Sequence, residues 1–428
     1  MSKKEIEICL VTVSATLGKQ IEVGERVNAQ HESLFRRFKA ENLGLVTSLK
    51  EAARIKSRVL KSDLLIISVA TGGTERLICD ICSETEALII LYPTFSDNSF
   101  ASCLEAFSKL KRTRENIRLV LEKNGKVTEK IAFYAKIIRA IKELDGSKLG
   151  VIGGTSAWLV ATTKSKELTG KKLGVRTVDV NMDELLDALS KIPVEEAKEH
   201  SKKILPKFDK TIEPSNKEIL EAIRIYRATK RLIKEKDLSA VTIKCFDLIG
   251  PAKNTACLAL SLLSDEGIVA ACEGDIDSAL TMMIVKQLTD RPALMANLND
   301  VNLEENTITL AHCTVATTLC ERCMLRSHFE SKIGVSIEGV LPLQKVTVCR
   351  IGENLGKMLI CTGKIAENLN DPNMCRTQIK VKLDANVRDL VSNTLGNHHI
   401  LSLGDHKEEL TEFCKLKNIV PILLDQSP

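Results

Sequence analysis

The N-terminal part of the chain alternates short, β-branched apolar runs with amphipathic segments, and this alternation limits the possible folds most strongly. The apolar runs, which predict strands, are EIEICLVTVSA, DLLIISVA, EALIILYPT, NIRLVLEK and KLGVIGGTS. The segments between them, such as ERVNAQHESLFRRFKAEN and SFASCLEAFSKLKR, have the periodicity of helices. Strands that alternate with helices form parallel sheets covered by helices. The pattern therefore predicts an α/β architecture here.

Two of these strands run into Gly-Gly turns, TGGTE at 71–75 and GGTSAW at 153–158. Open α/β sheets bind ligands at the edge where the carboxyl ends of the strands lie. Neither turn is a GxGxxG motif or a P-loop, so the indication of nucleotide binding is weak. Glycine that merely permits a tight turn is the alternative.

The rest of the chain changes character twice. A polar, lysine-rich segment at 193–218 is a candidate boundary, and the helix pattern KEILEAIRIYRATKRLIKEKD and the strand AVTIKCFDLI follow it. The final third has short strands broken by Gly, Pro and Asn, which predict an antiparallel, barrel-like β segment. The expected fold is two α/β domains with parallel sheets, at 1–145 and 146–295, followed by a β-rich, barrel-like domain at 296–428.

Composition excludes several classes of protein. Of the 428 residues, 44% are hydrophobic and 27% charged, as in globular proteins. A net charge of +5 and only 3% aromatic residues do not provide the basic, stacking surface of a nucleic-acid binder. No apolar run is long enough to span a membrane, and no secretory signal is visible. We expect a cytoplasmic protein without nucleic-acid or membrane partners, whose 14 cysteines are reduced.

The segment IVAACEGDIDSALTMMIV, residues 268–285, places Glu273, Asp275 and Asp277 among small apolar residues that are typical of a core. Burial raises the pKa of a carboxyl group unless a metal ion or a cation keeps it ionised. Glu273 is therefore a candidate catalytic or metal-binding residue. We expect Asp277 to be the N-cap of the helix SALTMMIVKQL.

Histidines provide further candidates, because the chain has only seven. His31 and His200 lie on polar helix patterns, where solvated side chains are expected. His312 follows a strand in ITLAHCT, and His398 and His399 form a pair in GNHHILS. Imidazole and carboxylate ligands together suit Mn²⁺, Co²⁺, Fe²⁺ or Zn²⁺. The alternative is a set of scattered polar groups, each satisfied where it lies.

A structural zinc site competes for the same segment. HCTVATTLCERC holds His312, Cys313, Cys320 and Cys323, which are possible zinc ligands. The pattern TVATTLCERCML also favours a helix, whereas zinc ribbons place their cysteine pairs in turns. Neither a nucleophile elbow nor an HExxH motif is present.

Six segments resemble the L-fucose isomerase/L-arabinose isomerase superfamily, most closely its shorter, fucose-isomerase-like members. In the order of that family they are CEGDIDSALTMMI, RPALMANLND, NTITLAHCTV, RSHFESKIGV, CRTQIKVKL and GNHHILSLGDHKEELTEFCKLKNI. They cover the chain from about 245 to 420 and are specific together, although none is specific alone. The first 200 residues match mainly in layout, with GGTE and GGTSAWL.

The resemblance implies a metal-dependent aldose–ketose isomerase that acts through an enediol, with Mn²⁺ as the expected ion and a trimer or hexamer as the assembly. It implies that Glu273 is both a metal ligand and a proton-transfer residue. It also implies metal ligands at His312 and His399. The second carboxylate ligand of the family falls on Asn297, whose carbonyl can bind a cation but cannot accept a proton at neutral pH.

Asn297 leaves the second proton carrier unassigned. Asp275, Asp247 and Asp300 are the candidates, in that order. The alternatives are that Glu273 works alone or together with a metal-bound water.

A sugar pocket requires polar groups that match hydroxyls. The candidates from the Gly-Gly turns and the later motifs are Thr71, Glu75, Ser156, Trp158, His328 and His398, with Arg322 as an alternative to His328. A core position for Trp158 is equally expected.

Three functional hypotheses follow. The first is an isomerase acting on a pentose, a 6-deoxyhexose or a related sugar. The second is another metal-dependent enzyme, acting on a modified or phosphorylated sugar, and the change at Asn297 motivates it. The third is a non-catalytic sugar-binding protein.

Overall fold

The computed structural model describes residues 4–122, 126–163 and 165–424, and it divides into two compact units. Unit 1 is Met1–Glu143 and unit 2 is Leu144–Pro428. Residues 1–3, which belong to the N-terminal segment where no secretory signal is visible, lie outside the described residues. The finer division of unit 2 near residue 295 stays a prediction.

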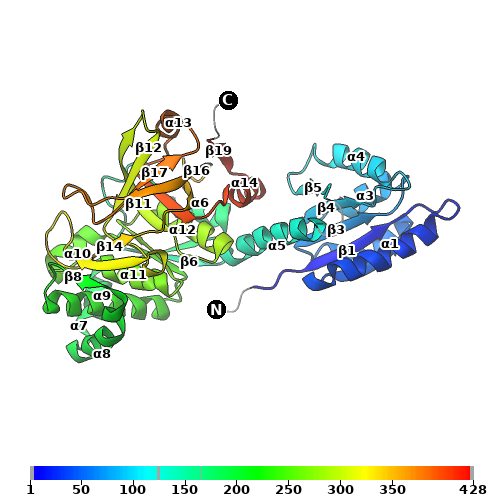
Figure 1. Cartoon of the computed structure of the whole chain (residues 1–428). Coiled ribbons are helices and arrows are strands. Elements are labelled where there is room, and N and C mark those ends of the chain that lie inside the picture. The colour runs from blue at the N-terminus through cyan, green and yellow to red at the C-terminus, as the bar shows by residue number, and fades with distance from the viewer. Residues whose placement is uncertain (1–3, 123–125, 164, 425–428) are drawn as a thin grey trace. The chain divides into compact units, whose positions relative to one another are not determined.

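Unit 1 is a parallel sheet with helices, as the alternation predicts (Figure 1). The strand order is β2-β1-β3-β4-β5. The strands are β1 (Ile8–Val13), β2 (Glu41–Val46), β3 (Leu64–Val69), β4 (Leu88–Pro93) and β5 (Ile117–Leu119). The helices are α1 (Gln20–Phe35), η1 (Arg36–Phe38), α2 (Leu49–Val59), α3 (Glu75–Cys82), α4 (Ser99–Leu110) and α5 (Lys126–Leu144). Residues of β1, β3 and β4 are buried throughout, because both faces of these strands are apolar.

Unit 2 begins with a second parallel sheet, of order β10-β9-β6-β7. Its strands are β6 (Lys148–Ile152), β7 (Arg176–Val180), β9 (Ala240–Ile243) and β10 (Val269–Cys272). The helices are α6 (Lys166–Leu173), α7 (Met182–Ser190), α8 (Val194–Ile204), η2 (Leu205–Lys207), α9 (Asn216–Glu235), α10 (Cys245–Ala252), α11 (Cys257–Asp265) and α12 (Ile276–Thr289). The segment 193–218, a candidate boundary, forms α8 and the start of α9 inside this unit.

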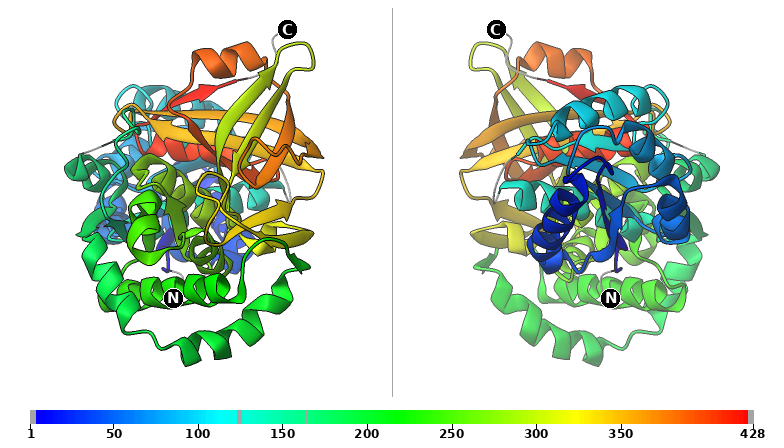
Figure 2. Two further views of the ribbon diagram at one scale, coloured as in Figure 1. Left: turned by 90° about the vertical axis from the view of Figure 1, so that its left-hand side faces the viewer. Right: turned by 90° about the vertical axis from the view of Figure 1, so that its right-hand side faces the viewer.

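A closed antiparallel barrel completes unit 2, at the opposite end from α7, α8 and α9 (Figure 2). Its strands are β11 (Leu294–Asn302), β12 (Thr307–His312), β15 (Lys345–Gly352), β16 (Lys357–Asn368), β17 (Thr377–Leu383) and β18 (His398–Leu403). The order β15-β18-β11-β12-β17-β16 is closed by the pairing of β15 with β16. β19 (Val420–Leu423) adds in parallel to β16. The helices of this region are α13 (Val387–Ser392) and α14 (Lys407–Leu416). The expected α/β fold with a C-terminal barrel is confirmed.

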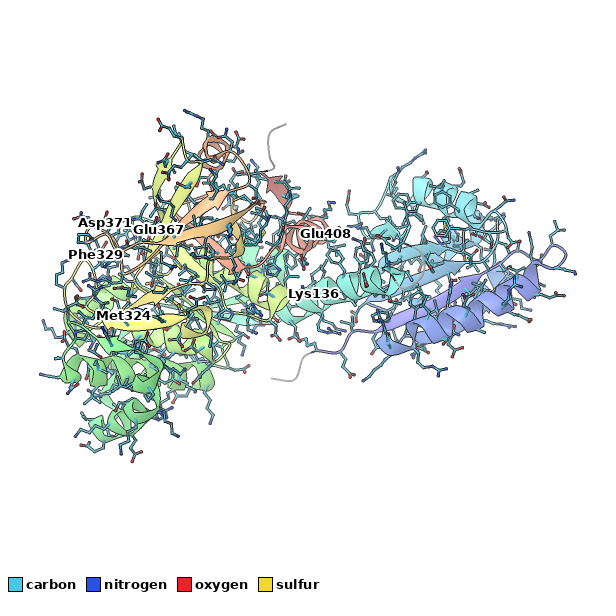
Figure 3. All side chains as sticks on the ribbon, viewed as in Figure 1. Lys136, Met324, Phe329, Glu367, Asp371 and Glu408 are labelled. Carbon is cyan, nitrogen blue, oxygen red and sulfur yellow. The ribbon has the colours of Figure 1, made fainter. Side chains whose placement is uncertain are left out.

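A small sheet of order β14-β13-β8 lies beside the barrel. Its strands are β8 (Lys210–Thr211), β13 (Arg322–Arg326) and β14 (Ser336–Val340). Met324 lies in β13, and Phe329 lies in the loop after this strand (both labelled in Figure 3). The segment before β13 is only a short turn of helix, η3 (Thr317–Leu319), so the helix favoured for TVATTLCERCML is wrong.

Two expectations from composition concern the described residues only. None of the described helices has both the length and the apolar character needed to cross a membrane. All fourteen cysteines lie within the described residues and are free thiols.

Candidate active site

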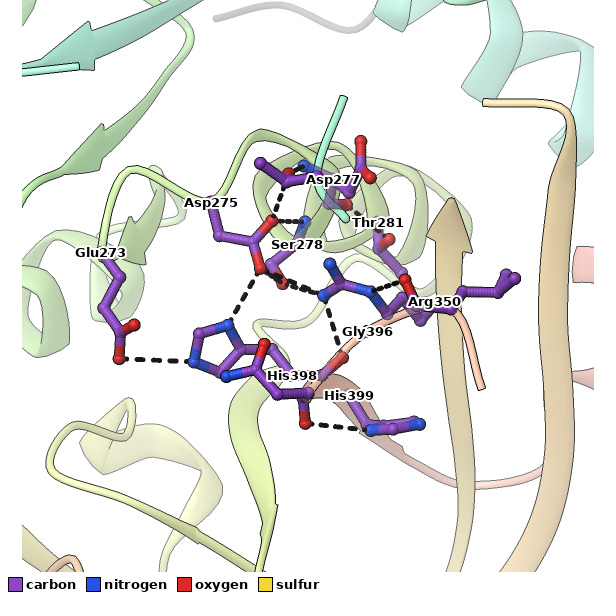
Figure 4. A network of polar contacts seen from close by, with 12 residues as sticks. Glu273, Asp275, Asp277, Ser278, Thr281, Arg350, Gly396, His398 and His399 are labelled. Carbon is purple, nitrogen blue, oxygen red and sulfur yellow. Dashed lines mark hydrogen bonds and ion pairs between the residues drawn. The ribbon is translucent and has the colours of Figure 1, made fainter. Parts of the chain in front are cut away.

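Three segments that are far apart in the sequence bring polar side chains together in unit 2. Glu273 follows β10, His312 ends β12 and His398 begins β18. One possible ligand atom from each of the three lies within 4.8 Å of the other two, and all three residues are buried. Figure 4 shows the approach of Glu273 to His398.

A strained turn positions Glu273. Glu273 and Gly274 connect β10 to α12 with φ values of 62° and 68°. A side chain on Gly274 would clash with the carbonyl oxygen of Gly154, so this position requires glycine. The backbone N–H of Ser156 donates to the carbonyl oxygen of Glu273 at 3.1 Å. The second Gly-Gly turn of the sequence therefore packs against the acidic segment. A left-handed backbone at a non-glycine residue costs of order 1–3 kcal/mol and is typical of functional positions.

Asp275, and not Asp277, caps α12. The Asp275 carboxylate accepts hydrogen bonds from the backbone N–H of Ser278 at 3.0 Å and from its hydroxyl at 2.8 Å. The helix begins at Ile276, directly after the glycine turn, so the prediction for Asp277 is wrong by two residues. Asp277 instead accepts a hydrogen bond from the backbone N–H of Thr163 at 3.1 Å.

A buried network keeps Asp275 ionised (Figure 4). Oδ2 of Asp275 lies 2.9 Å from Nδ1 of His398 and 3.1 Å from Nη1 of Arg350. Its Oδ1 accepts a hydrogen bond from the hydroxyl of Thr162 at 3.0 Å. Burial raises the pKa of Asp275, but the hydrogen bond of His398 and the charge of Arg350 outweigh it and hold this pKa well below its usual range. Asp275 is thus an anionic acceptor, which argues against its role as a substitute acid.

His398 lies between two carboxylates. Its Nδ1 faces Asp275, and its Nε2 is 3.4 Å from Oε1 of Glu273. Burial lowers the pKa of His398, but the hydrogen bonds with Asp275 and Glu273 outweigh this effect and raise it. Burial likewise raises the pKa of Glu273, but the hydrogen bond and charge of His398, the charge of His312 and the Trp158 hydrogen bond lower it overall. Glu273 is therefore set up as an ionised ligand and base.

The group fits a divalent cation. Among the described residues, Nδ1 of His312 is buried without a hydrogen-bond partner, and the contact of Nε2 of His398 is the 3.4 Å approach to Oε1 of Glu273, its neighbour in the group. Burial lowers the pKa of His312 to about 4, which keeps its imidazole neutral at physiological pH. A metal-binding histidine commonly donates its other N–H to a carboxylate, and the contact of His398 with Asp275 has this form. Two imidazoles and a carboxylate suit Mn²⁺, Fe²⁺, Co²⁺ or Zn²⁺.

His399, the expected third ligand, is not part of this group. Successive residues of a strand point to opposite sides, so His399 is directed away when its neighbour His398 faces Glu273. His399 is fully buried, with Nδ1 3.4 Å from the carbonyl oxygen of Asn397. The family resemblance selected the second histidine of the pair, whereas the structure places the first beside Glu273 and His312.

A cavity of about 780 Å³ opens at the group, within the range of small-molecule sites. Glu273, His312 and Asn297 line it together with Trp158 and His328. The indole N–H of Trp158 donates to Oε2 of Glu273 at 2.7 Å, so the side chain of Trp158 belongs to the site and is half exposed. The cavity thus contains three of the predicted ligands and two of the predicted sugar-binding residues.

Other predicted sugar-binding residues lie outside the described lining of this cavity. Ser156 is buried, and its hydroxyl has no hydrogen-bond partner in the described part of the chain. Arg322 is exposed and pairs with Asp209 at 3.7 Å. Thr71 and Glu75 belong to unit 1, where the Thr71 hydroxyl is buried against the Ala15 backbone.

The remaining acid candidates are also absent from the described lining. Asp247 pairs with Lys244 at 2.7 Å. Asp300 is an exposed residue of β11. Their places outside this lining give no support to either residue as the second proton carrier.

The four residues of the alternative zinc site do not come together. His312 and Cys313 line the cavity, whereas Cys320 and Cys323 do not belong to the described lining. Among the residues that the structure describes, these four do not form a cluster of possible ligands, whereas Glu273, His312 and His398 do.

Several residues of the site are not predicted by the sequence patterns. Arg350 is fully buried in β15 and binds Asp275; the signal for it was a single charge inside the apolar run VTVCRIG. Glu330 also lines the cavity, and it lies in the motif RSHFESKIGV, where nothing in the local sequence distinguishes it. The cavity wall also includes five cysteines, namely Cys245, Cys257, Cys272, Cys313 and Cys375. Nothing in their spacing indicated that they share a surface.

Comparisons with known proteins agree with this chemistry. No protein-family model matches the chain. It is 29% identical over 201 residues to a sulfoquinovose isomerase of Clostridium sp. (strain MSTE9), a match covering 44% of each chain. It is 24% identical over 308 residues to a sulfoquinovose isomerase of Alkalicoccus urumqiensis, covering 68% of each. A third, from Priestia megaterium (strain ATCC 12872 / QMB1551), is 22% identical over 307 residues, 68% of this chain and 67% of the relative. These relatives confirm the expectation of an isomerase enzyme.

Proposed function

We propose that the protein is an aldose–ketose sugar isomerase that uses a divalent cation and an enediol intermediate, within the fucose/arabinose isomerase superfamily. The convergence of Glu273, His312 and His398 at a cavity carries this proposal. Similarity to proteins named as sugar isomerases supports the reaction type.

The residues present match the needs of this reaction. Isomerisation moves one proton between C2 and C1 of the sugar. A divalent ion held by Glu273, His312 and His398, with Mn²⁺ as the expected ion, would stabilise the negative charge that develops on the sugar oxygens. Glu273 is the group that moves the carbon-bound proton, since its pKa is lowered and its carboxylate lines the cavity.

Two neighbours orient these groups. The Trp158 indole holds one oxygen of Glu273, which leaves the other oxygen toward His398. Asn297 lines the cavity with its amide group. The amide can accept hydrogen bonds from sugar hydroxyls and donate hydrogen bonds to them, but it moves no proton.

The sugar itself is either unmodified or carries an anionic group. The relatives are named for sulfoquinovose, a sulfonated sugar, which favours a modified substrate. Against this, the described residues that line the cavity include neither lysine nor arginine. His328 is a basic side chain of this lining: burial lowers its pKa, but the neighbouring Cys313 raises it overall.

The test is a turnover assay with Mn²⁺, in which ketose formation is followed for sulfoquinovose and for a panel of pentoses and 6-deoxyhexoses. We expect one of these sugars to isomerise, with loss of turnover on chelation and in Glu273→Gln. A preference for sulfoquinovose over its unsulfonated counterpart would assign the modified substrate. Absence of turnover for all sugars, in protein that has bound Mn²⁺, would contradict the proposal.

The proposal extends to a cytoplasmic homo-oligomer, a trimer or a hexamer. Analytical ultracentrifugation of the full chain measures the assembly, and a monomer at micromolar concentration would contradict this part.

A further inference from the structure

Glu330 is a carboxylate of the cavity wall that the proposed chemistry has not yet used. It follows Phe329 in the loop between β13 and β14, and it lines the same cavity as Glu273 (Figure 3 shows Phe329). The two acids come from different elements, since Glu273 follows β10 of the parallel sheet. A sugar in the cavity would therefore meet a second carboxylate besides Glu273.

The Glu330 carboxylate is free to act. Within the described parts of the chain, no hydrogen bond or ion pair holds it. This distinguishes Glu330 from the other acids near the site. Asp275 is fixed by Arg350 and His398, and Asp277 is fully buried and bound to the backbone of Thr163.

The surroundings of the Glu330 carboxyl group raise its pKa above the ordinary value, although the residue is exposed. Partial burial raises the pKa of this carboxyl group, and the negative charges of Cys313 and Glu273 add to the effect, while His328 opposes it. A carboxyl group that lines the cavity and whose pKa is raised is suited to give and take a proton there.

We infer that Glu330 is the second proton carrier of the isomerisation and replaces the acid that is missing at Asn297. This inference rests on the proposed function. Glu273 takes the proton from C2 as the C1–C2 double bond forms, and protonated Glu330 gives its proton to O1, which yields the neutral enediol. The Glu330 carboxylate then takes the proton of O2 as the C2 carbonyl forms, and Glu273 returns its proton to C1. Both acids end in their starting states, and no oxidant or reductant is needed.

The test uses the full-length protein with Mn²⁺ and the sugar that the wild type turns over best. Glu330→Gln is expected to lower kcat by roughly 10²–10⁴-fold, the usual contribution of a general acid or base. Mn²⁺ content and KM should change less than about threefold. Glu330→Asp, which keeps the carboxyl group, should recover part of the lost kcat.

Glu321→Gln is the matched control, because Glu321 is an exposed glutamate just before β13 and is outside the described cavity lining. It should keep wild-type kcat. A Glu330→Gln variant with wild-type kcat would overturn the inference, and so would a loss confined to KM, which would assign Glu330 to substrate binding. If the wild type isomerises no sugar, the proposed function itself fails and the inference fails with it; if the wild type is active, only the inference is at stake.

Discussion

Nδ1 of His398 lies 2.9 Å from Oδ2 of Asp275, and this contact connects the candidate metal centre to the helix that follows it. Asp275 is the N-cap of α12 and is also the partner of the buried Arg350. The same carboxylate thus ends a helix, neutralises a buried cation and fixes the ring of a candidate ligand. In the acidic segment of the sequence, Asp275 therefore has a structural role, whereas the proposed role of Glu273 is that of metal ligand and base.

Asp275→Asn tests this division of roles. An amide cannot balance the charge of Arg350, and breaking a buried ion pair typically costs about 3–5 kcal/mol. The variant also replaces the charged acceptor that orients His398 by a neutral amide oxygen, and mutation of such a partner typically weakens metal affinity about 10–100-fold. We expect both effects, measured by urea unfolding and by Mn²⁺ titration calorimetry. Unchanged metal affinity would contradict the orienting role.

Asp277→Asn is expected to act through pH. Burial raises the pKa of Asp277 to about 6, above its ordinary value of 3.8. The folded state therefore holds this proton more tightly than the unfolded state, and the resulting stability is present below about pH 4 and lost as pH rises through 6. Asparagine does not ionise. The free energy of unfolding of the variant, relative to that of the wild type, should therefore increase between pH 4 and pH 8 by up to about 3 kcal/mol.

Urea unfolding of both proteins at pH 4 and pH 8 measures this gain. The amide oxygen of asparagine can still accept the hydrogen bond from the Thr163 backbone, so the comparison isolates the charge. A difference in stability that stays the same at the two pH values would show that Asp277 does not titrate in this range.

Gly274→Ala tests the turn that positions Glu273. The new side chain would meet the Gly154 carbonyl and would occupy a left-handed backbone conformation, so we expect a loss of about 2–4 kcal/mol in the free energy of unfolding. Gly170→Ala is the control, because Gly170 lies in α6 with open space around it. There alanine should be neutral or should stabilise by about 0.5–1 kcal/mol. Equal effects at both positions would contradict the packing argument.

The α/β fold and the barrel followed from sequence patterns because buried strands such as β3 and β4 are apolar on both faces. β2 was missed, because Glu41–Val46 is only partly buried and its polar start continues a helix pattern. Glu273 and His312 could be predicted as metal ligands, because each lies in a short segment, CEGDIDSALTMMI or NTITLAHCTV, that carries the family resemblance. The sequence could not decide between His398 and His399 as the ligand, because the answer depends on which side of β18 faces the site.

Metal binding should depend on pH chiefly through His398. The pKa of His398 is raised by its two carboxylate partners, so its Nε2 must lose a proton before it binds an ion. His312, with a pKa lowered to about 4, needs no such step at neutral pH. We expect proton release on Mn²⁺ binding and weaker binding as pH falls, measured by calorimetry in buffers of different ionisation enthalpy. Binding without proton release, and independent of pH, would contradict the assigned role of His398.

The most direct measurement is the anomalous diffraction of crystals grown with Mn²⁺. The account predicts one strong anomalous peak in the cavity, bound by Glu273, His312 and His398, with Nδ1 of His398 still donating to Asp275. A peak bound by His399 instead, or no peak beside Glu273 at saturating Mn²⁺, would contradict the metal centre on which the proposed isomerase rests.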